Sequence, residues 1–155
     1  MKEPKTLSAV AEFHKTFQHP VLDTPQIPDE KRCTLRISLL AEELNELKEA
    51  VEDKDLVEIA DALCDIQYVL SGAVLEFGLK DKFKDLFDEV QRSNMSKACK
   101  TREEAERTQT HYQKQGVESR IEEIDGKFLV FRIPDNKTLK SVDYSPADLA
   151  SILEK

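Results

Sequence analysis

Two long segments joined by a short charged break place the strongest constraint on the fold of this chain. In residues 30–53 and again in residues 55–77, apolar side chains recur with the 3.6-residue period of an α-helix. The charged residues 52–55 predict a tight corner, so the two helices should be antiparallel neighbours. Asp55 is predicted to cap the second helix, with Glu58 as its reciprocal capping partner.

Shorter elements are predicted on both sides of this helical pair. Residues 127–133 are rich in β-branched and aromatic side chains and should pair with residues 118–124 across a turn-forming Asp-Gly dipeptide. The fold class is therefore all-α with a small β-hairpin arm, in a single domain of 155 residues. The remaining predicted helices are residues 6–17, 81–97 and 102–115, and a short C-terminal helix with Ser145 as its N-cap and Pro146 at its first position.

Composition and charge exclude several functional classes. The formal net charge is −8, which argues against a general grip on a nucleic-acid backbone. The most apolar stretch, residues 56–79, carries four carboxylates, which a membrane-spanning helix does not tolerate. The three cysteines form no CxxC motif and no long apolar segment lies near the first residue, so reduced thiols and no signal peptide are expected. These features predict a cytoplasmic protein without nucleic-acid or membrane partners.

Acidic residues on the two long helices give the main functional signal. Glu43 and Glu46 are three residues apart on the first helix, and Glu58 and Asp61 are three apart on the second, so each pair shares a helix face. Residues 55–79 contain no Lys or Arg that could neutralise the second pair within its helix. If the folded hairpin brings the pairs together, each contact between like charges at ~4 Å costs on the order of 4 kcal/mol at an effective dielectric constant of about 20. A divalent cation removes this cost, and all-carboxylate ligation suits Mg²⁺ or Mn²⁺ rather than zinc.

The same acids also fit a different interpretation, in which they only face water. Most glutamates on helix surfaces are solvated and take part in no site. In that case the chain is a non-catalytic helical dimerisation or regulatory module.

The acidic positions resemble the signature of a known family. Glu42-Glu43-Leu44-Asn45-Glu46, followed by Glu58-Ile59-Ala60-Asp61, is similar to the EExxE…ExxD pattern of the all-α NTP pyrophosphohydrolases. That superfamily includes MazG-like proteins, dimeric dUTPases, dCTP pyrophosphatases and phosphoribosyl-ATP pyrophosphohydrolase. The resemblance extends over about residues 10–100 and the C-terminus, whereas residues 100–133 depart from it. Other segments that resemble the family are Phe13-His14, the proline-rich connector, Ser93-Asn94-Met95-Ser96-Lys97 and Tyr144-Ser145-Pro146-Ala147-Asp148-Leu149.

The resemblance implies a four-helix-bundle core over about residues 5–100, with an arm and tail at residues 101–155, assembled as a homodimer or homotetramer. It implies hydrolysis of a nucleoside triphosphate, such as dUTP, dCTP or a non-standard NTP, to the monophosphate and pyrophosphate in nucleotide-pool house-cleaning. Phosphoribosyl-ATP is the alternative substrate. The implied ligands of Mg²⁺, or of Mn²⁺, are Glu43, Glu46, Glu58 and Asp61.

Further residues are assigned to the reaction and to the substrate. Glu42 is assigned to orienting or deprotonating the attacking water, with Glu46 as the other choice. Phe17 and Tyr68 could stack on a base, although core packing is the other interpretation, and His14 is interpreted as a core or surface residue. The predicted substrate-binding residues are Asp65, Asn94, Lys97, Lys137 and Lys140; Asn94 and Lys97 also fit simple caps of a helix C-terminus.

Overall fold

The structure of the protein is a computed structural model that describes residues 2–154. The chain forms two compact units, Met1–Phe83 and Lys84–Lys155. The all-α class and the small hairpin predicted from the sequence are both confirmed. The single domain predicted for residues 1–155 stays a prediction.

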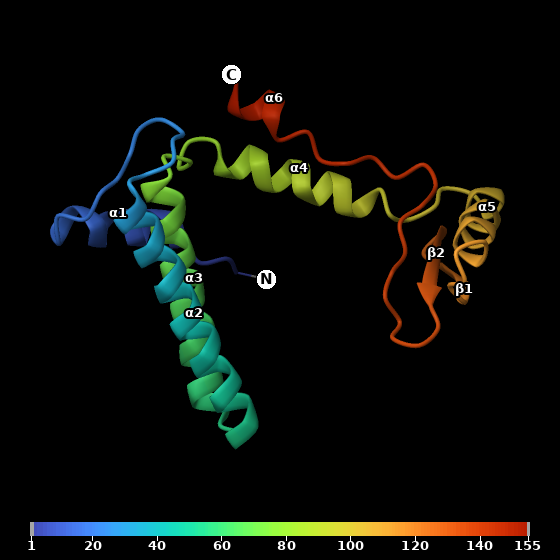
Figure 1. Cartoon of the computed structure of the whole chain (residues 1–155), viewed down its shortest axis with the longest axis horizontal. Coiled ribbons are helices and arrows are strands. Elements are labelled where there is room, and N and C mark those ends of the chain that lie inside the picture. Colours follow the sequence, from blue (N-terminus) through green and yellow to red (C-terminus); the bar gives the residue numbers. More distant parts are fainter. Residues whose placement is uncertain (1, 155) are drawn as a thin grey trace. The chain divides into compact units, whose positions relative to one another are not determined.

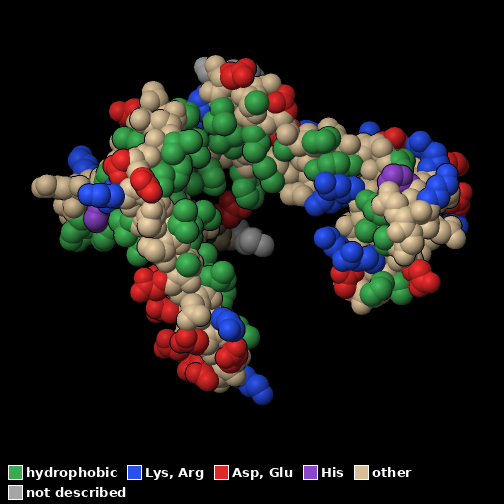
Figure 2. All heavy atoms as spheres, in the orientation of Figure 1, with side chains coloured by type: hydrophobic (Ala, Val, Ile, Leu, Met, Phe, Trp, Pro, Cys, Tyr) green, Lys and Arg blue, Asp and Glu red, His purple; other side chains and the backbone are tan. Residues whose placement is uncertain are grey.

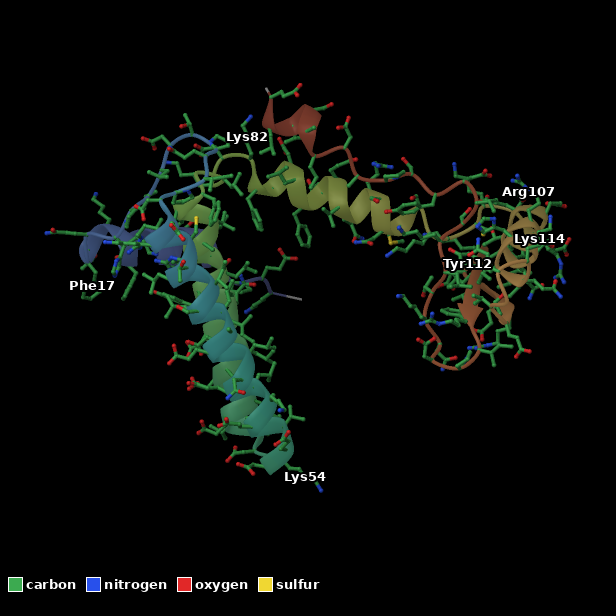
Figure 3. The ribbon with its side chains drawn as sticks, in the orientation of Figure 1. Phe17, Lys54, Lys82, Arg107, Tyr112 and Lys114 are labelled. Carbon is green, nitrogen blue, oxygen red and sulfur yellow. The ribbon has the colours of Figure 1, made fainter. Side chains whose placement is uncertain are left out.

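Three helices make up the first unit: α1 (Thr6–Thr16), α2 (Glu30–Asp53) and α3 (Leu56–Glu76). Helices α2 and α3 form the predicted hairpin, and α1 packs against α3 (Figure 1). Lys54 lies at the tip of the hairpin in Figure 3 and adopts a left-handed backbone conformation with φ of 58°. This conformation ends α2 and reverses the chain within two residues.

Asp55 caps α3 as predicted. Its Oδ1 atom accepts the backbone N–H groups of Val57 at 2.9 Å and Glu58 at 3.2 Å. The predicted return bond from Glu58 to the N–H of Asp55 is wrong, because that N–H donates to the carbonyl oxygen of Ala50 at 3.0 Å. The Glu58 carboxylate is therefore not used in closing the corner.

The proline-rich connector between α1 and α2 is fastened to the end of α3. The N–H of Leu22 donates to the carbonyl oxygen of Leu75 at 3.0 Å. Gly78 has φ of +69°, and a Cβ atom at this position would overlap the carbonyl group of Thr24. Backbone contact thus holds the connector against α3, and glycine is required where the two segments approach.

The second unit contains α4 (Phe83–Met95), α5 (Arg102–Gln113), β1 (Ser119–Ile124), β2 (Lys127–Arg132) and the short helix α6 (Ala150–Leu153). The two strands are antiparallel, and their turn residues Asp125 and Gly126 have φ of 50° and 71°, as a type I′ turn requires. Helix α5 packs on the hairpin, and Tyr112, labelled in Figure 3, packs against the core between them. The buried core residues are Cys99, Ala105, Val130 and Leu139.

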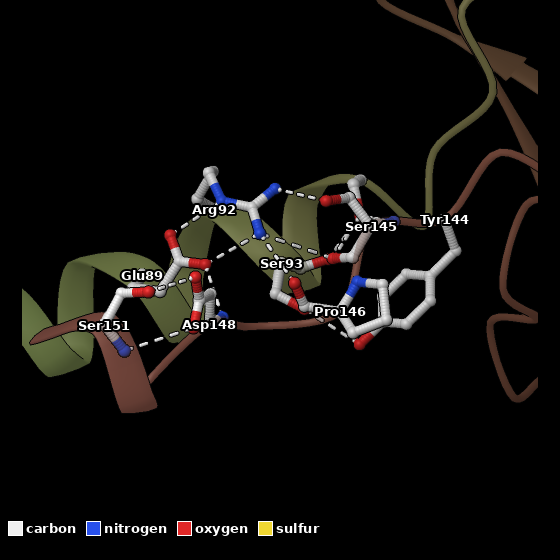
Figure 4. A network of polar contacts seen from close by, with 9 residues as sticks. Glu89, Arg92, Ser93, Tyr144, Ser145, Pro146, Asp148 and Ser151 are labelled. Carbon is white, nitrogen blue, oxygen red and sulfur yellow. Dashed lines mark hydrogen bonds and ion pairs between the residues drawn. The ribbon is translucent and has the colours of Figure 1, made fainter.

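The C-terminal segment is held to α4 by Arg92 (Figure 4). Arg92 donates from Nη1 to Oγ of Ser145 at 3.0 Å and from Nη2 to the carbonyl oxygen of Pro146 at 2.9 Å. The predicted helix start at Ser145 and Pro146 is wrong, because both residues lie in this extended, tethered segment. Helix α6 begins later, where the Asp148 side chain accepts the N–H of Ser151 at 3.2 Å. No helix within residues 2–154 is both long and apolar enough to cross a membrane.

Candidate active site

Six carboxylates on α2 and α3 form what we call the acidic cluster. Figure 2 shows acidic side chains gathered over this hairpin. Within the described part of the chain, the carboxylate group of none of the six takes part in an ion pair or a hydrogen bond. The cluster consists of Glu42, Glu43, Glu46, Glu58, Asp61 and Asp65.

Glu43 is the centre of the acidic cluster. It is half-buried, whereas the other five are exposed. Burial raises its pKa, and the negative charges of Glu46, Asp65, Glu42 and Asp61 raise it further, in that order. The structure therefore brings carboxylates of α3 close enough to those of α2 for mutual repulsion. Glu58, predicted as a metal ligand, is not among these neighbours of Glu43.

The donor chemistry of the acidic cluster fits Mg²⁺. Crowded carboxylates that lack a protein cation offer the hard oxygen ligands that this ion prefers. Among residues 2–154, no three His, Cys, Asp or Glu side chains converge closely enough to form a finished metal cage. The ligand set Glu43, Glu46, Glu58 and Asp61 stays a prediction, as do the catalytic roles of Glu42 and Glu46.

A cleft of about 470 Å³ lies beside the acidic cluster in the first unit. Phe13 and Tyr68 meet edge to face in its wall, with ring centroids 5.6 Å apart and planes at 84°, and His19 stacks on Phe13 at 5.8 Å. Tyr68 thus lines the cleft, whereas the sequence left open whether it belongs to the core or to a binding site. Phe17 is 60% exposed and packs on Phe13. The lining residues are Val10, Phe13, His14, His19, Leu35, Arg36, Leu39, Glu43, Asp65, Tyr68 and Val69.

A buried ionic network underlies the cleft, and sequence analysis missed it. Glu76 is fully buried and accepts Nε of Arg32 at 2.9 Å, while Nη2 of Arg36 also donates to it. Burial opposes ionisation of Glu76, but the hydrogen bonds from the two arginines outweigh it and keep its pKa below the usual value. The one available signal was the spacing of Arg36, which lies seven residues before Glu43 and so shares its helix face.

His14 joins the buried side of the cleft and is 2% exposed. Its Nδ1 atom is 2.8 Å from the carbonyl oxygen of Pro20. A carbonyl oxygen can only accept, so Nδ1 carries the proton and Nε2 is the acceptor of the neutral ring. Burial lowers the pKa of His14, and the nearby Arg36 charge also lowers it, so the neutral form is favoured.

The other predicted substrate-binding residues lie in the second unit. Nζ of Lys97 donates to Oδ1 of Asn94 at 2.7 Å, as a simple helix-terminal pair does. The Lys140 ammonium group lies 4.5 Å from the centroid of the Tyr144 ring, and the side chain of Lys137 is exposed. Asp65 alone among these candidates lines the cleft. The substrate-binding roles of all these residues stay predictions.

The helical hairpin with its carboxylates on facing helices matches the architecture of the all-α NTP pyrophosphohydrolases. Residues 10–94, more than half of the chain, match the family described as phosphoribosyl-ATP pyrophosphohydrolase. The chain therefore belongs to this family, and the resemblance inferred from the sequence is confirmed. The match ends within α4, before α5 and the β-hairpin.

A viral protein shares part of this sequence. "Uncharacterized protein L479" of Acanthamoeba polyphaga mimivirus is 39% identical over 93 residues. The alignment covers 57% of this chain and 37% of the viral protein, so the chain spans little more than a third of that relative's length.

Proposed function

We propose that this protein is a magnesium-dependent nucleoside triphosphate pyrophosphohydrolase that releases a nucleoside monophosphate and pyrophosphate. The observation that carries the proposal is the crowding of unpaired carboxylates around half-buried Glu43, beside a cleft lined with aromatic and basic side chains. Such repulsion is costly unless a cation is bound. The proposed substrates are dUTP, dCTP or a non-standard NTP, which the protein would remove from the nucleotide pool.

The residues of the acidic cluster would have two roles, metal binding and activation of the attacking water. Glu43, Glu46, Glu58 and Asp61 would hold Mg²⁺, which when bound neutralises phosphate charge and lowers the pKa of a coordinated water. Glu42, or Glu46 in its place, accepts the proton of the attacking water. Water attacks one of the two phosphorus atoms of the bond between the α and β phosphates, and the leaving group, pyrophosphate or the nucleoside monophosphate, departs with the electron pair of the broken P–O bond. Phosphoryl transfer of this kind depends mainly on positioning and charge neutralisation.

Phosphoribosyl-ATP is the second candidate substrate. The family match favours it, because the matched family takes its name from this compound. The same acidic cluster would serve both substrates, since each carries a polyphosphate chain. The two candidates differ only in what occupies the rest of the cleft.

We further propose that the protein assembles as a homodimer or homotetramer through the α2–α3 hairpin. Ile37, Leu44 and Val51 recur every seven residues on α2 and are 69%, 61% and 54% exposed. Leu56, Leu63 and Leu70 recur in the same way on α3 and are 77%, 52% and 40% exposed. Exposed apolar stripes with a heptad spacing are typical of helices that pack against further helices. A second copy of the hairpin would cover both stripes in a four-helix bundle.

A pyrophosphate-release screen tests the function. The protein is incubated with Mg²⁺ and each common NTP and dNTP, and with phosphoribosyl-ATP in a separate reaction. We expect release from at least one compound and none after chelation of the metal. If no compound yields pyrophosphate, the chain is instead a non-catalytic helical module. Size measurement by light scattering over a concentration series tests the assembly, and a monomer at all concentrations would contradict it.

A further inference from the structure

A buried guanidinium group with one unused donor lies beside the acidic cluster. Arg36 is 7% exposed, lines the cleft and donates from Nη2 to Glu76. Its Nε–H group has no hydrogen-bond partner among the residues that the structure describes. Buried donors are seldom left unpaired, and an exception calls for a specific cause. A ligand in the cleft is one such cause.

The charge balance around Arg36 also points to a ligand. Arg32 and Arg36 share the single carboxylate of Glu76, so these three side chains, of which Arg32 is partly exposed, carry a net charge of +1 when all are ionised. His14 beside them is held in its neutral form by burial and adds no charge. The basic end of the cleft therefore attracts an electron-rich acceptor, whereas the acidic end at Glu43 attracts a cation.

Gly72 on α3 makes room for the polar ends of both side chains. A Cβ atom at this position would lie 2.7 Å from Nη1 of Arg36 and 3.0 Å from Nε2 of His14. The two nitrogens therefore converge on one spot of α3. Because Arg36 and His14 both line the cleft, the absence of a side chain at Gly72 lets a guanidinium donor and an imidazole acceptor lie close together at its edge.

We propose that Arg36 determines which nucleotide the cleft accepts, by donating to an oxygen on the part of the nucleotide remote from the polyphosphate. This inference rests on the proposed function. Arg36 and Glu43 are seven residues apart on α2, or about 10 Å at ~1.5 Å per residue, a length that the sugar and base of a nucleotide can span. With the polyphosphate at the acidic cluster, the remote part of the substrate reaches Arg36.

Two sources can supply that oxygen. One is the ring carbonyl of uracil, thymine, cytosine or guanine. The other is the phosphate on the phosphoribosyl group of phosphoribosyl-ATP, which lies outside the triphosphate chain. The adenine base has no ring carbonyl, so dATP offers neither group. These differences let a panel of substrates identify the source.

Steady-state kinetics of Arg36→Lys tests the proposal. Lysine keeps the positive charge next to Glu76 but loses the planar fork of donors. For a substrate that carries the recognised base carbonyl or phosphate, we expect kcat/KM to fall about 10- to 100-fold, mainly through KM. For dATP, kcat/KM should change by less than about twofold. A loss for dUTP, dTTP, dCTP and dGTP but not for phosphoribosyl-ATP identifies the base carbonyl, and a loss confined to phosphoribosyl-ATP identifies the phosphate of its phosphoribosyl group. An equal loss for all substrates, or no loss, overturns the proposal.

Two further variants separate recognition from folding. Gly72→Ala favours the helix but pushes the ends of Arg36 and His14 away, so it should cause the same selective loss with unchanged helicity by circular dichroism. Arg32→Lys is the matched control, because Arg32 also pairs with Glu76 but is not among the residues lining the cleft. Selectivity should be unchanged in this control. A selectivity change in Arg32→Lys as large as that in Arg36→Lys assigns the effect to the network and contradicts direct recognition.

A binding experiment without metal or polyphosphate keeps this inference separate from the proposed function. Uridine, adenosine and ribose 5-phosphate are titrated into the wild type and into Arg36→Lys, and binding is followed by NMR. We expect uridine or ribose 5-phosphate to bind more tightly than adenosine, and this preference to disappear in the variant. If no pyrophosphate is released from any compound but this preference is found, the proposed function fails and the role of Arg36 in recognition stands. The absence of any Arg36-dependent preference sinks the inference.

Discussion

The acidic cluster of the first unit and the arginines of the second unit differ in whether their charges are paired. In the second unit, five arginines each form an ion pair with an acid on the same or a neighbouring element, whereas the acidic cluster of the first unit has no such partner among the described residues. The guanidinium group of Arg36 likewise keeps a donor unused. The pairs of the second unit are Arg92 with Glu89, Arg102 with Glu106, Arg107 with Asp143, Arg120 with Glu122, and Arg132 with Asp135.

This difference distinguishes charged groups that stabilise the fold from charged groups that a bound ligand would neutralise. Local pairs at the surface contribute little each and define no binding site. Like charges held together, or a buried donor left without an acceptor, lower the stability of the free protein and persist where a ligand compensates for them. We therefore propose that the chemistry takes place in the first unit and that the ion pairs of the second unit are structural.

The largest expected effect on stability comes from Glu76, the buried acid of the first unit that pairs with two arginines. Glu76→Gln leaves buried Arg36 and half-buried Arg32 without this counter-charge, so we expect the free energy of unfolding to fall by about 3–5 kcal/mol. Urea denaturation measures the change. The matched control is Glu52→Gln, in a pair with Lys48 at 3.9 Å whose side chains are 66% and 70% exposed, and it should cost less than about 0.5 kcal/mol. Equal effects in the two variants would mean that the buried network is not what holds the cleft.

In contrast to Glu76→Gln, Glu43→Gln should cause a large loss of activity and no loss of stability. The substitution removes a carboxylate that its neighbours repel, so the metal-free protein should be as stable as the wild type or slightly more stable. Pyrophosphate release should fall on the order of 100-fold or more, because charge stabilisation at the transferred phosphate is lost. Paired assays of turnover and thermal unfolding measure both effects. Full turnover in Glu43→Gln would remove the acidic cluster from the mechanism.

The fold could be predicted largely from local sequence patterns. The hairpin of α2 and α3 follows from apolar periodicity and a four-residue charged corner, and the β-hairpin follows from Asp125-Gly126. The C-terminal helix was placed too early because Ser145-Pro146 is a good local start signal. The contact that overrides this signal comes from Arg92, a residue 53 positions earlier in the chain.

One part of the candidate site could be predicted from local sequence spacing, and the other part depends on contacts between residues far apart in the sequence. The acidic cluster could be predicted because two of its pairs, Glu43 with Glu46 and Glu58 with Asp61, lie three residues apart on helices joined by a short corner. The pairing of Arg36 with Glu76 joins residues 40 positions apart, and the space over Gly72 depends on how α1, α2 and α3 pack. No local sequence pattern encodes such contacts, so the basic end of the cleft could be recognised only in the folded structure.

A smaller effect is expected from the interior of the second unit, at the hydrogen-bonded hydroxyl group of Thr108. The Thr108 hydroxyl is buried, donates to the carbonyl oxygen of Glu104 at 2.8 Å and accepts the N–H of Val142 at 3.1 Å. Thr108→Val keeps the shape but leaves that N–H without an acceptor, so stability should fall by about 1–3 kcal/mol. Thr110→Val is the control, because the exposed hydroxyl of Thr110 donates to the Glu106 carbonyl at 2.8 Å in the same helical geometry. Comparable losses in both variants would show that Val142 does not depend on Thr108.

The smallest effect concerns the surface pair that fastens the C-terminal segment to α4. The hydrogen bonds from Arg92, and that from the N–H of Asp148 at 2.8 Å, lower the pKa of Glu89 from 4.5 to about 2. Since the folded-state pKa is depressed, the stabilisation by Glu89 is fully present above about pH 4.5 and is lost as the pH falls toward 2. In Glu89→Gln, the difference in stability from the wild type should therefore shrink over this interval. Asp88→Asn, a substitution on the same helix away from the C-terminal segment, should leave the response unchanged. The chemical shift of the Asp148 amide proton reports ionisation of Glu89 directly, and a midpoint near 4.5 instead of 2 would show that this tether does not form in solution.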